Sequence, residues 1–348
     1  MSSSPSSGKP RRSPPQIPRP SSSVVVVSPD NQVLLLHRVK TSTSFASAHV
    51  FPGGNLDAFH DGDIPPPGSP LRHEDGRAYR LGAVRECFEE TGILLARTGD
   101  KDGDLVHLGT AAERDEARTR IHGNAVRFMD FVGSTGGVPD IDNLIPFTRW
   151  ITPANVPKRF TTQMYIYLLP LDTTLPSEML VPTPDGGVEH TAATFAHAST
   201  FLDRAAGGEI ILFPPQVYLL HHVARFLPAP GDGDGDGSAD HRASQRERLV
   251  NFLRAVPTTS SAAAHGHPTS RIAWADKVIS PHTLFLRKAD GRVVLGLDKP
   301  GPELATTSRG GDHESVALVR FAEGGLSDVE IRLRAHVLAE EKSYKDKL

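Results

Sequence analysis

The sequence predicts a mixed α/β fold, in which short strands alternate with amphipathic helices. Near the N-terminus, runs of β-branched and apolar residues lie on both sides of a Pro-Asp-Asn turn, which is typical of a β-hairpin. Further along, apolar residues recur at spacings of three and four, which indicates helices. At 348 residues the chain is long enough to bury one large core or two modest ones.

The predicted elements follow in order along the chain. The hairpin is expected at 23–28 and 32–38, and a third strand at 48–51 ends in Pro-Gly-Gly. A helix at 79–91 carries Leu81, Val84 and Phe88 on one face, and Gly92 is well placed to end it. The same patterns predict helices at 111–122, 125–132, 195–206, 214–226 and 245–255, strands at 145–151 and 162–169, and a run of short strands around 283–297 and 315–321.

Composition divides the chain into regions. Residues 1–22 are rich in Ser and Pro and contain no acids, so we expect a disordered tail ahead of a folded domain at 23–227. Residues 228–240 are almost all Pro, Gly and Asp, which is typical of a flexible linker. Beyond the linker lies a C-terminal segment, 241–348, to which the sequence assigns no role. Within the domain, residues 57–77 are rich in Asp, Gly, Pro and His and lack periodicity, so we expect an exposed loop.

Charge and cysteine content limit the classes of partner. The formal net charge of −3 and the pI near 6.6 give no overall attraction to DNA or to an anionic membrane, so phosphate binding must be local. A single cysteine, Cys87, excludes an internal disulfide and favours an intracellular protein. No apolar run approaches the roughly 20 residues of a membrane helix. We therefore expect a local binding site, and no membrane or DNA as a partner.

Three glutamates share one face of the helix at 79–91. Glu86 precedes Glu89 and Glu90 by three and four residues, and like charges at these spacings destabilise a helix by roughly 0.2–0.5 kcal/mol per pair. Glu89 and Glu90 also lie near the helix C-terminus, where the dipole favours cations. A divalent cation would convert this repulsion into coordination. The alternative is a solvated acidic face, partly relieved by Arg85 pairing with Glu89.

Upstream of this helix, Gly53 and Gly54 follow a strand and allow the backbone to approach a ligand closely, although a double glycine alone indicates only a turn. Together, Gly54 and the run Arg85 to Ile93 resemble the Nudix box, which reads Gly, five residues, Glu, seven residues, then Arg-Glu-apolar-x-Glu-Glu-x-Gly-apolar. The second half matches at every specified position. The resemblance implies the Nudix fold, an αβα sandwich with a mixed sheet, here followed by a C-terminal extension.

The first half of the box, which spans 54–93, departs from this pattern. Gly54 and Arg85 lie 31 positions apart, so about 17 residues are inserted, at about 57–77. The box Glu would fall on a residue that is not an acid, His60 counted forward or Arg77 counted back. We expect an acid near the end of the insert, Glu74 or Asp75, to substitute. We also expect the insert to shape one wall of the substrate cleft.

An interrupted box of this kind is similar to the peroxisomal coenzyme A and acyl-coenzyme A diphosphatases, and the likeness extends over about 22–227. It implies cleavage of coenzyme A or acyl-coenzyme A to 3′,5′-ADP and (acyl-)4′-phosphopantetheine, with Mg²⁺ or Mn²⁺. Thr43 and Ser47 stand where the coenzyme A signature has Arg and Gly, so the substrate stays open. The terminal Asp346-Lys347-Leu348 keeps two residues of a peroxisomal address, which makes the peroxisome one expected location beside the cytoplasm and the mitochondrion.

The resemblance also implies residue roles. Glu86 and Glu90 would be the first metal ligands, Glu89 would complete the cluster or help to deprotonate water, and the carbonyl of Gly54 would be a further ligand. Arg85 would orient the glutamates through ion pairs.

Three cations flank the later strands and are candidates to grip the outer phosphates of the substrate, although a merely solubilising role is an equal alternative: Arg149, Lys158 and Arg159.

Two rival functions remain. A Nudix enzyme could instead cleave NADH, another nucleotide diphosphate, a dinucleoside polyphosphate, a sugar nucleotide or capped RNA. The missing box Glu and the long insert also allow a catalytically silent Nudix-like binding module. Retention of Glu86, Glu89 and Glu90 together argues against a silent module, which has no need of a costly cluster.

Overall fold

The computed structural model describes residues 15–38, 47–99, 103–171, 190–231, 238–259, 261–322 and 325–346. Most of the predicted tail, the centre of the linker at 232–237, Thr43 and the terminal Lys347 and Leu348 lie outside the described residues. Within the described residues, no helix combines the length and the apolar character needed to span a bilayer.

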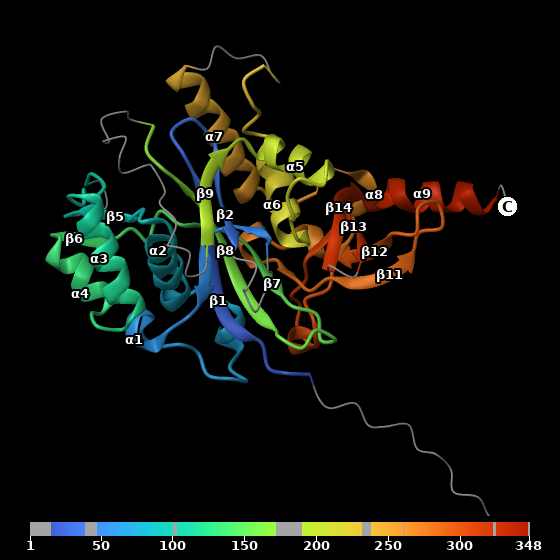
Figure 1. The fold of residues 1–348 in the computed structure, drawn as a ribbon. Coiled ribbons are helices and arrows are strands. Elements are labelled where there is room, and N and C mark those ends of the chain that lie inside the picture. Colours follow the sequence, from blue (N-terminus) through green and yellow to red (C-terminus); the bar gives the residue numbers. More distant parts are fainter. Residues whose placement is uncertain are drawn as a thin grey trace, which may run out of the picture.

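The chain forms a large mixed sheet, a four-stranded C-terminal sheet and a two-stranded sheet, with helices packed around them (Figure 1). The strands of the large sheet are β1 (Arg19–Val27), β2 (Val33–Arg38), β3 (His49–Val50), β4 (Gly53–Asn55), β7 (Ile145–Ile151), β8 (Phe160–Leu168), β9 (His190–Ala196) and β10 (Val278–Ile279). The C-terminal sheet contains β11 (His282–Leu286), β12 (Val293–Leu297), β13 (Asp312–Ala322) and β14 (Gly325–Leu333), and the small sheet pairs β5 (Ala96–Thr98) with β6 (Gly137–Pro139). The α-helices are α1 (Ala58–Asp61), α2 (Arg77–Thr91), α3 (Ala111–His122), α4 (Phe128–Ser134), α5 (Ala198–Ala206), α6 (Pro214–Ala224), α7 (Ala239–Arg254), α8 (Ala262–His265) and α9 (Arg334–Lys345).

The large sheet has the strand order β10-β7-β8-β1-β2-β3, with β4 also paired to β1 and β9 to β2. Strands β1 and β8 run parallel in continuous register, as do β10 and β7 over a short stretch, whereas the other neighbours are antiparallel. The prediction of a mixed α/β fold with a mixed sheet is therefore confirmed.

Strand β1 divides the core into two layers because successive side chains of a strand point to opposite faces. Val24 and Val26 pack with α2, α3 and α4, whereas Val25 and Val27 pack with α5, α6, α7 and part of the C-terminal sheet. Figure 1 shows α2, α3 and α4 on one side of the sheet and α5, α6 and α7 on the other. The central sheet thus lies between two helical layers, as the αβα expectation requires, and the extra strands lie C-terminal.

Local sequence explains where several elements begin and end. Helix α3 starts at a capping box, in which the Thr110 hydroxyl accepts from the Glu113 amide and the Glu113 carboxylate accepts from the Thr110 amide. Helix α2 ends at Gly92, whose φ of 74° is left-handed and whose amide donates to the carbonyl of Phe88. Both boundaries agree with the predicted ones within about two residues.

Other expectations need correction. Strand β1 begins at Arg19, inside the expected tail, because it pairs with β8 from that residue onward. Residues 195–196, expected to start a helix, belong to strand β9, which pairs with β2. Helix α7 begins at Ala239, where the side chain of Ser238 caps it, so the linker ends earlier than expected.

The insert is largely exposed, as its composition indicates, but it is not without regular structure. It contains α1 and a 3₁₀ turn, η1 (Pro70–His73), and several of its polar residues are buried. Arg72 donates from its guanidinium to the carbonyl of Pro65, and its own carbonyl accepts from the Tyr79 hydroxyl. Burial is tolerated because these polar groups find partners within the protein.

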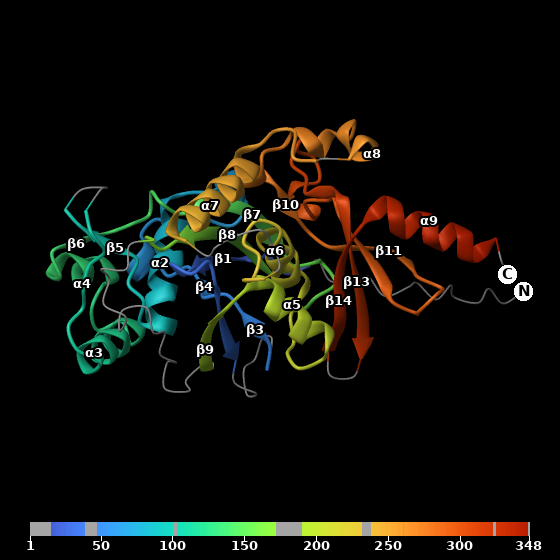
Figure 2. The ribbon, with the colours of Figure 1, turned by 90° about the horizontal axis from the view of Figure 1, so that it is seen from above.

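The C-terminal segment is part of the same folded body as the first domain. Strand β10 adds to the edge of the large sheet beside β7. Trp274, Leu295 and Ala317 share one apolar core with Val25 and Phe147. Figure 2 shows α7 lying over the strands of the large sheet, with β11, β13 and α9 beyond them.

A buried arginine joins α7 to the first hairpin. The guanidinium of Arg246 donates to the Asn31 side chain at 2.7 Å, to the Ser28 carbonyl at 2.6 Å and to the Leu169 carbonyl at 2.5 Å. These bonds connect residues more than 70 positions apart in sequence and hold the start of the C-terminal segment against the sheet.

Candidate active site

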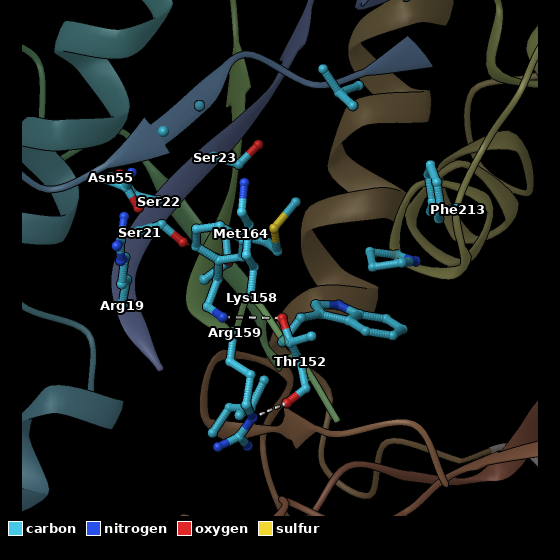
Figure 3. Close-up of a pocket in the computed structure, with 18 of the residues that line it drawn as sticks. Arg19, Ser21, Ser22, Ser23, Asn55, Thr152, Lys158, Arg159, Met164 and Phe213 are labelled. Atoms are coloured by element: carbon cyan, nitrogen blue, oxygen red, sulfur yellow. Dashed lines mark hydrogen bonds between the residues drawn. The ribbon is translucent and has the colours of Figure 1, made fainter. Parts of the chain in front are cut away.

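A cavity of about 2010 Å³ lies between the box and the C-terminal segment. Its lining includes β1, β4, the acidic face of α2, the turn before β8, the start of α6 and parts of the C-terminal sheet. In Figure 3, Ser21, Ser22 and Ser23 line one side from β1, and Phe213 lies across the cavity from them. The volume exceeds the roughly 300–1,000 Å³ of ordinary small-molecule pockets, so the cavity admits a large ligand.

Strand β4 brings the two glycines against the glutamates of α2. The Gly53 amide donates to Oε2 of Glu90 at 2.8 Å. A Cβ atom on Gly54 would lie 2.5 Å from the carboxylate carbon of Glu86, so any side chain there would displace this carboxylate from its present position. Gly53 has a φ of 156°, which also disfavours a side chain there. The glycine pair therefore lets the backbone reach the carboxylates.

Arg85 lies at the centre of the charged groups. Its guanidinium donates to both carboxylate oxygens of Asp61 at 2.9 Å, to Glu86 at 2.9 Å and to Glu89 at 2.8 Å. It also donates to the carbonyl of Asn55 at 3.0 Å. Charge-assisted bonds of this kind fix orientation strongly. Arg85 therefore holds two of the glutamates in place, as the resemblance implies.

Asp61 occupies the place expected of the missing box acid, and the predicted substitutes do not. Its side chain is fully buried and forms a bidentate pair with Arg85. Asp75 instead pairs with Arg80 and accepts from the hydroxyl of Tyr165, and neither it nor the exposed Glu74 lines the cavity. The expectation of Glu74 or Asp75 was wrong because the chain folds back into α1 immediately after the glycines.

A signal for Asp61 was present in the sequence. It stands one residue after His60, where a forward count from Gly54 places the box Glu. His60 itself accepts from the Phe128 amide at Nδ1, so its Nε2 carries the proton and donates to the Asn124 side chain at 2.6 Å. His60 thus ties α1 to the start of α4.

The remainder of the insert lies away from the cavity. Asp57 and His60 line it, but residues 62–74 do not. The expectation that the insert shapes a wall therefore holds only for its first turn. His122, at the end of α3, also lines the cavity and places Nδ1 3.2 Å from Oε2 of Glu89.

Burial and neighbouring acids raise the pKa of Glu86 to about 7. Burial is the larger cause, Glu89 and Asp61 add to the effect, and Arg85 opposes it. Among the residues that the structure describes, no three His, Cys, Asp or Glu side chains are arranged to hold a metal ion as they stand, and Arg85 lies between Glu86 and Glu89. The carboxylate oxygens beside Gly54 are nevertheless the kind of ligand that a hard divalent cation prefers.

Arg149 does not reach the cavity, in contrast to the expectation that it grips phosphate. It is only 1 % exposed, donates to the Glu74 carbonyl at 2.8 Å and to the Thr161 hydroxyl at 3.2 Å, and stacks over the ring of Tyr79. Its role is to fasten the end of the insert to the sheet. Arg149 misses the cavity because its position on β7 turns the side chain toward the layer that contains α2.

Arg159 and Lys158 are adjacent in sequence, but the first is buried and the second is exposed. Arg159 lines the cavity, but its guanidinium donates to the carbonyls of Thr152 and Gln16 and to both carboxylate oxygens of Glu303. Lys158 is exposed and lines the cavity from the turn before β8 (Figure 3). Lys158 is therefore better placed than Arg159 to meet a ligand.

Comparison with known proteins identifies proteins that are similar to this chain. A family model described as the NUDT19 Nudix domain matches residues 66–223. The acyl-coenzyme A diphosphatase NUDT19 of Gallus gallus is 29% identical over 280 residues, which cover 67% of this chain and 70% of that protein. The putative nudix hydrolase 7 of Caenorhabditis elegans is 29% identical over 197 residues, covering 56% of each chain.

A human acyl-coenzyme A diphosphatase NUDT19 is 28% identical over 156 residues, covering 43% of this chain and 40% of that protein. The chain thus spans between 40% and 70% of the length of these curated relatives. Among solved structures, a Nudix hydrolase from Alicyclobacillus acidocaldarius aligns with a TM-score of 0.46 at 23% identity, covering 60% of this chain and 91% of that one.

Proposed function

Because this chain belongs to the Nudix hydrolase family, we propose that it cleaves the diphosphate bond of coenzyme A or an acyl-coenzyme A. The products are 3′,5′-ADP and (acyl-)4′-phosphopantetheine. The observation that carries the proposal is the network of Glu86, Glu89 and Arg85, completed by Asp61, at one end of a cavity large enough for such a substrate. The curated relatives named as acyl-coenzyme A diphosphatases support the substrate class.

Members of this family generally require a divalent metal ion, and we assign Mg²⁺ or Mn²⁺ to the acidic face of α2. Glu86 and Glu90 would hold the ion, with Glu89 and the Gly54 carbonyl as further ligands. The ion supplies Lewis-acid stabilisation of the charge on the diphosphate oxygens. Burial is the main cause of the raised pKa of Glu86, and Glu89 and Asp61 add to it; a cation bound there would stabilise the charged carboxylate.

The chain's own residues orient the reaction. Arg85, which is held by Asp61, would orient the side chains of Glu86 and Glu89 toward the cavity through ion pairs. Glu89 would help to deprotonate the attacking water, and His122, whose Nδ1 lies 3.2 Å from Oε2 of Glu89, would pass the proton to the open cavity. Lys158 would contact the outer phosphates of the substrate. Arg159, paired with Glu303, would shape the cavity wall beside it.

A direct assay tests the proposal. The purified chain is incubated with coenzyme A, palmitoyl-coenzyme A, NADH or capped RNA, with Mg²⁺, with Mn²⁺ or with chelator, and products are separated by chromatography. We expect 3′,5′-ADP from the first two substrates, and only with metal. Turnover of NADH or capped RNA alone would assign a different Nudix substrate, and no turnover on any of them would favour the silent binding module.

A matched pair of variants assigns the site. Glu86→Gln is expected to lower kcat about 1,000-fold, since loss of several kcal/mol of charge stabilisation is tenfold per 1.4 kcal/mol. The control is Glu74→Gln, an exposed acid outside the cavity, which should match the wild type. Equal activity of both variants would remove the acidic face of α2 from the active site.

A further inference from the structure

The C-terminal sheet supplies a wall of the cavity that the box does not provide. Each of its four strands contributes to the lining, Thr283 from β11, Leu295 from β12, Phe321 from β13 and Leu326 from β14. In Figure 3, the ribbon of the C-terminal segment runs below Lys158 and Arg159. The segment for which the sequence gives no role is therefore part of the site.

Phe321 and Leu326 form the apolar end of this wall. They are directly paired in the register of β13 and β14, so their side chains project from the same face of the hairpin. Phe321 is 64 % exposed, and its exposed surface lines the cavity. Apolar surface in a concave site gains free energy when a ligand removes it from water.

The wall is fixed relative to the carboxylates. Glu303, in the 3₁₀ turn η5 (Pro302–Leu304), pairs with both terminal nitrogens of Arg159 at 2.5 and 3.1 Å. The Arg159 side chain is completely buried, and buried bidentate pairs of this kind impose a specific geometry. Together with the shared core and the β10–β7 pairing, this pair holds the sheet at the rim of the cavity.

The chemistry of the lining changes from one end of the cavity to the other. The α2 end presents Glu86, Glu89 and Glu90, which suit a metal ion and a diphosphate. Around the C-terminal sheet the lining includes Leu295, Leu326 and Phe321 and the prolines of the adjacent turns, which carry no amide donor; polar side chains of His282, Thr283 and Lys299 also line this part. The end formed by Phe321 and Leu326 suits a hydrocarbon chain better than a sugar or a base, both of which need hydrogen bonds.

We propose that the C-terminal sheet binds the acyl chain of an acyl-coenzyme A, with Phe321 and Leu326 making the principal contacts. The inference rests on the proposed function, because it places the diphosphate of the same substrate at the carboxylates of α2. In an acyl-coenzyme A the pantetheine arm separates the diphosphate from the acyl group, so the two ends of the substrate need two distant and chemically different parts of one cavity. The cavity of about 2010 Å³ joins such parts.

The test measures selectivity. For Phe321→Ala and for Leu326→Ala, kcat/KM is determined with free coenzyme A and with acetyl-, octanoyl- and palmitoyl-coenzyme A. We expect the ratio of kcat/KM for palmitoyl-coenzyme A to that for free coenzyme A to fall about tenfold, with a smaller fall for octanoyl- and none for acetyl-coenzyme A. The control is Leu286→Ala on β11 of the same sheet, which is 63 % exposed but lies outside the cavity and should leave every ratio unchanged.

The outcomes separate the two proposals. If the wild type hydrolyses both substrates and neither variant changes the ratio, the acyl site is overturned and the proposed function stands. An equal loss on free coenzyme A and on every thioester also leaves the ratio unchanged and overturns the acyl site, because the wall would then hold the nucleotide half. If the wild type hydrolyses neither coenzyme A nor its thioesters, the proposed function fails and the acyl site fails with it.

Discussion

The box and the C-terminal sheet line the same cavity with opposite physical chemistry. In the box, Asp61, Arg85 and Glu89 are charged groups withdrawn from water, a costly arrangement that requires every partner to be present. In the C-terminal sheet, Leu295 and Phe321 are ordinary apolar residues of ordinary strands. The comparison shows that a site can be predicted from the sequence when its residues are unfavourable for the local secondary structure. A site made of residues that suit their strands gives no such signal.

The two regions also differ in how they are held. The box is tied by contacts between neighbours, since Arg85 and Glu89 are four residues apart and Asp61 is only 24 residues from Arg85. The C-terminal segment is tied by bonds across more than 140 positions, such as Arg159 with Glu303. Substitutions can therefore separate local from long-range contributions to the same cavity.

The largest effect on stability is expected where Arg246 of α7 binds the first hairpin. Arg246→Ala removes three hydrogen bonds to Asn31, Ser28 and Leu169, and we expect the free energy of unfolding to fall by about 3 kcal/mol, measured by urea denaturation. The control is Arg248→Ala, an exposed arginine on the same helix, which should change it by less than about 0.5 kcal/mol. Equal effects of the two variants would show that these bonds do not stabilise the segment.

In the box, the next largest effect is expected from Asp61→Asn. The variant keeps the shape but removes the charge that positions Arg85, and losing such a supporting partner lowers metal affinity or activity roughly 10- to 100-fold. The apparent metal affinity and kcat are measured together, because a purely structural role would alter neither in the folded protein. Asp75→Asn is the comparison, and a loss as large there would return Asp75 to the role of box acid.

The core shared by the first domain and the C-terminal segment contains a buried histidine, His222 on α6. Burial lowers the pKa of His222 well below 6.5, and His221, Arg225 and Lys277 lower it further. His222 packs among the rings of Phe147, Tyr218, Phe252 and Trp274.

Because the pKa of His222 is lowered in the folded protein, the protein is expected to lose stability as the pH falls. The unfolded chain binds a proton near pH 6.5 that the folded protein resists, so the stabilising contribution is complete above that pH and is lost as the pH falls. Lowering the pH from 6.5 to 5.5 should cost about 1 kcal/mol from this group. In His222→Phe, urea unfolding at both pH values should show a pH dependence smaller by that amount. An unchanged pH dependence would mean that other buried histidines, such as His73, account for it.

The smallest effect is expected at Lys158, in the cavity between the regions. Lys158→Gln should raise KM roughly two- to fivefold and leave kcat nearly unchanged, because an exposed cation contributes about 0.2–1 kcal/mol to an ion pair. Arg149→Gln is the contrast, since this buried residue should lower stability without a selective change in KM. A rise in KM confined to the Arg149 variant would reverse the two assignments.

Much of the first domain could be predicted because its signals are local. The capping box at Thr110 and Glu113 and the left-handed Gly92 mark helix ends through neighbouring residues. The strand runs of β7 and β8 and the glutamates of α2 were likewise visible in the sequence alone. The placement of Gly54 beside Glu86 agrees with the interpretation of the box, although their metal roles remain proposals.

The missed features depend on partners far away in sequence. Strands β9 and β14 and helix α9 were not predicted, and β9 exists because β2 offers it an open edge. Arg149 and Lys158 look equivalent in the sequence, and only the strand register and the turn before β8 place one in the core and the other in the cavity. Tertiary context decided these positions where local preference was silent.

The pairing of β10 with β7 affects how the protein is made. Strand β7 is synthesised on the order of 100 residues before β10, so at about 5–20 residues per second its outer edge stays without this neighbour for roughly ten seconds on the ribosome. An open strand edge is a template for association with other chains. A recombinant fragment that stops after Leu227, where composition would invite a truncation, would keep that edge open permanently and should aggregate where the full chain does not.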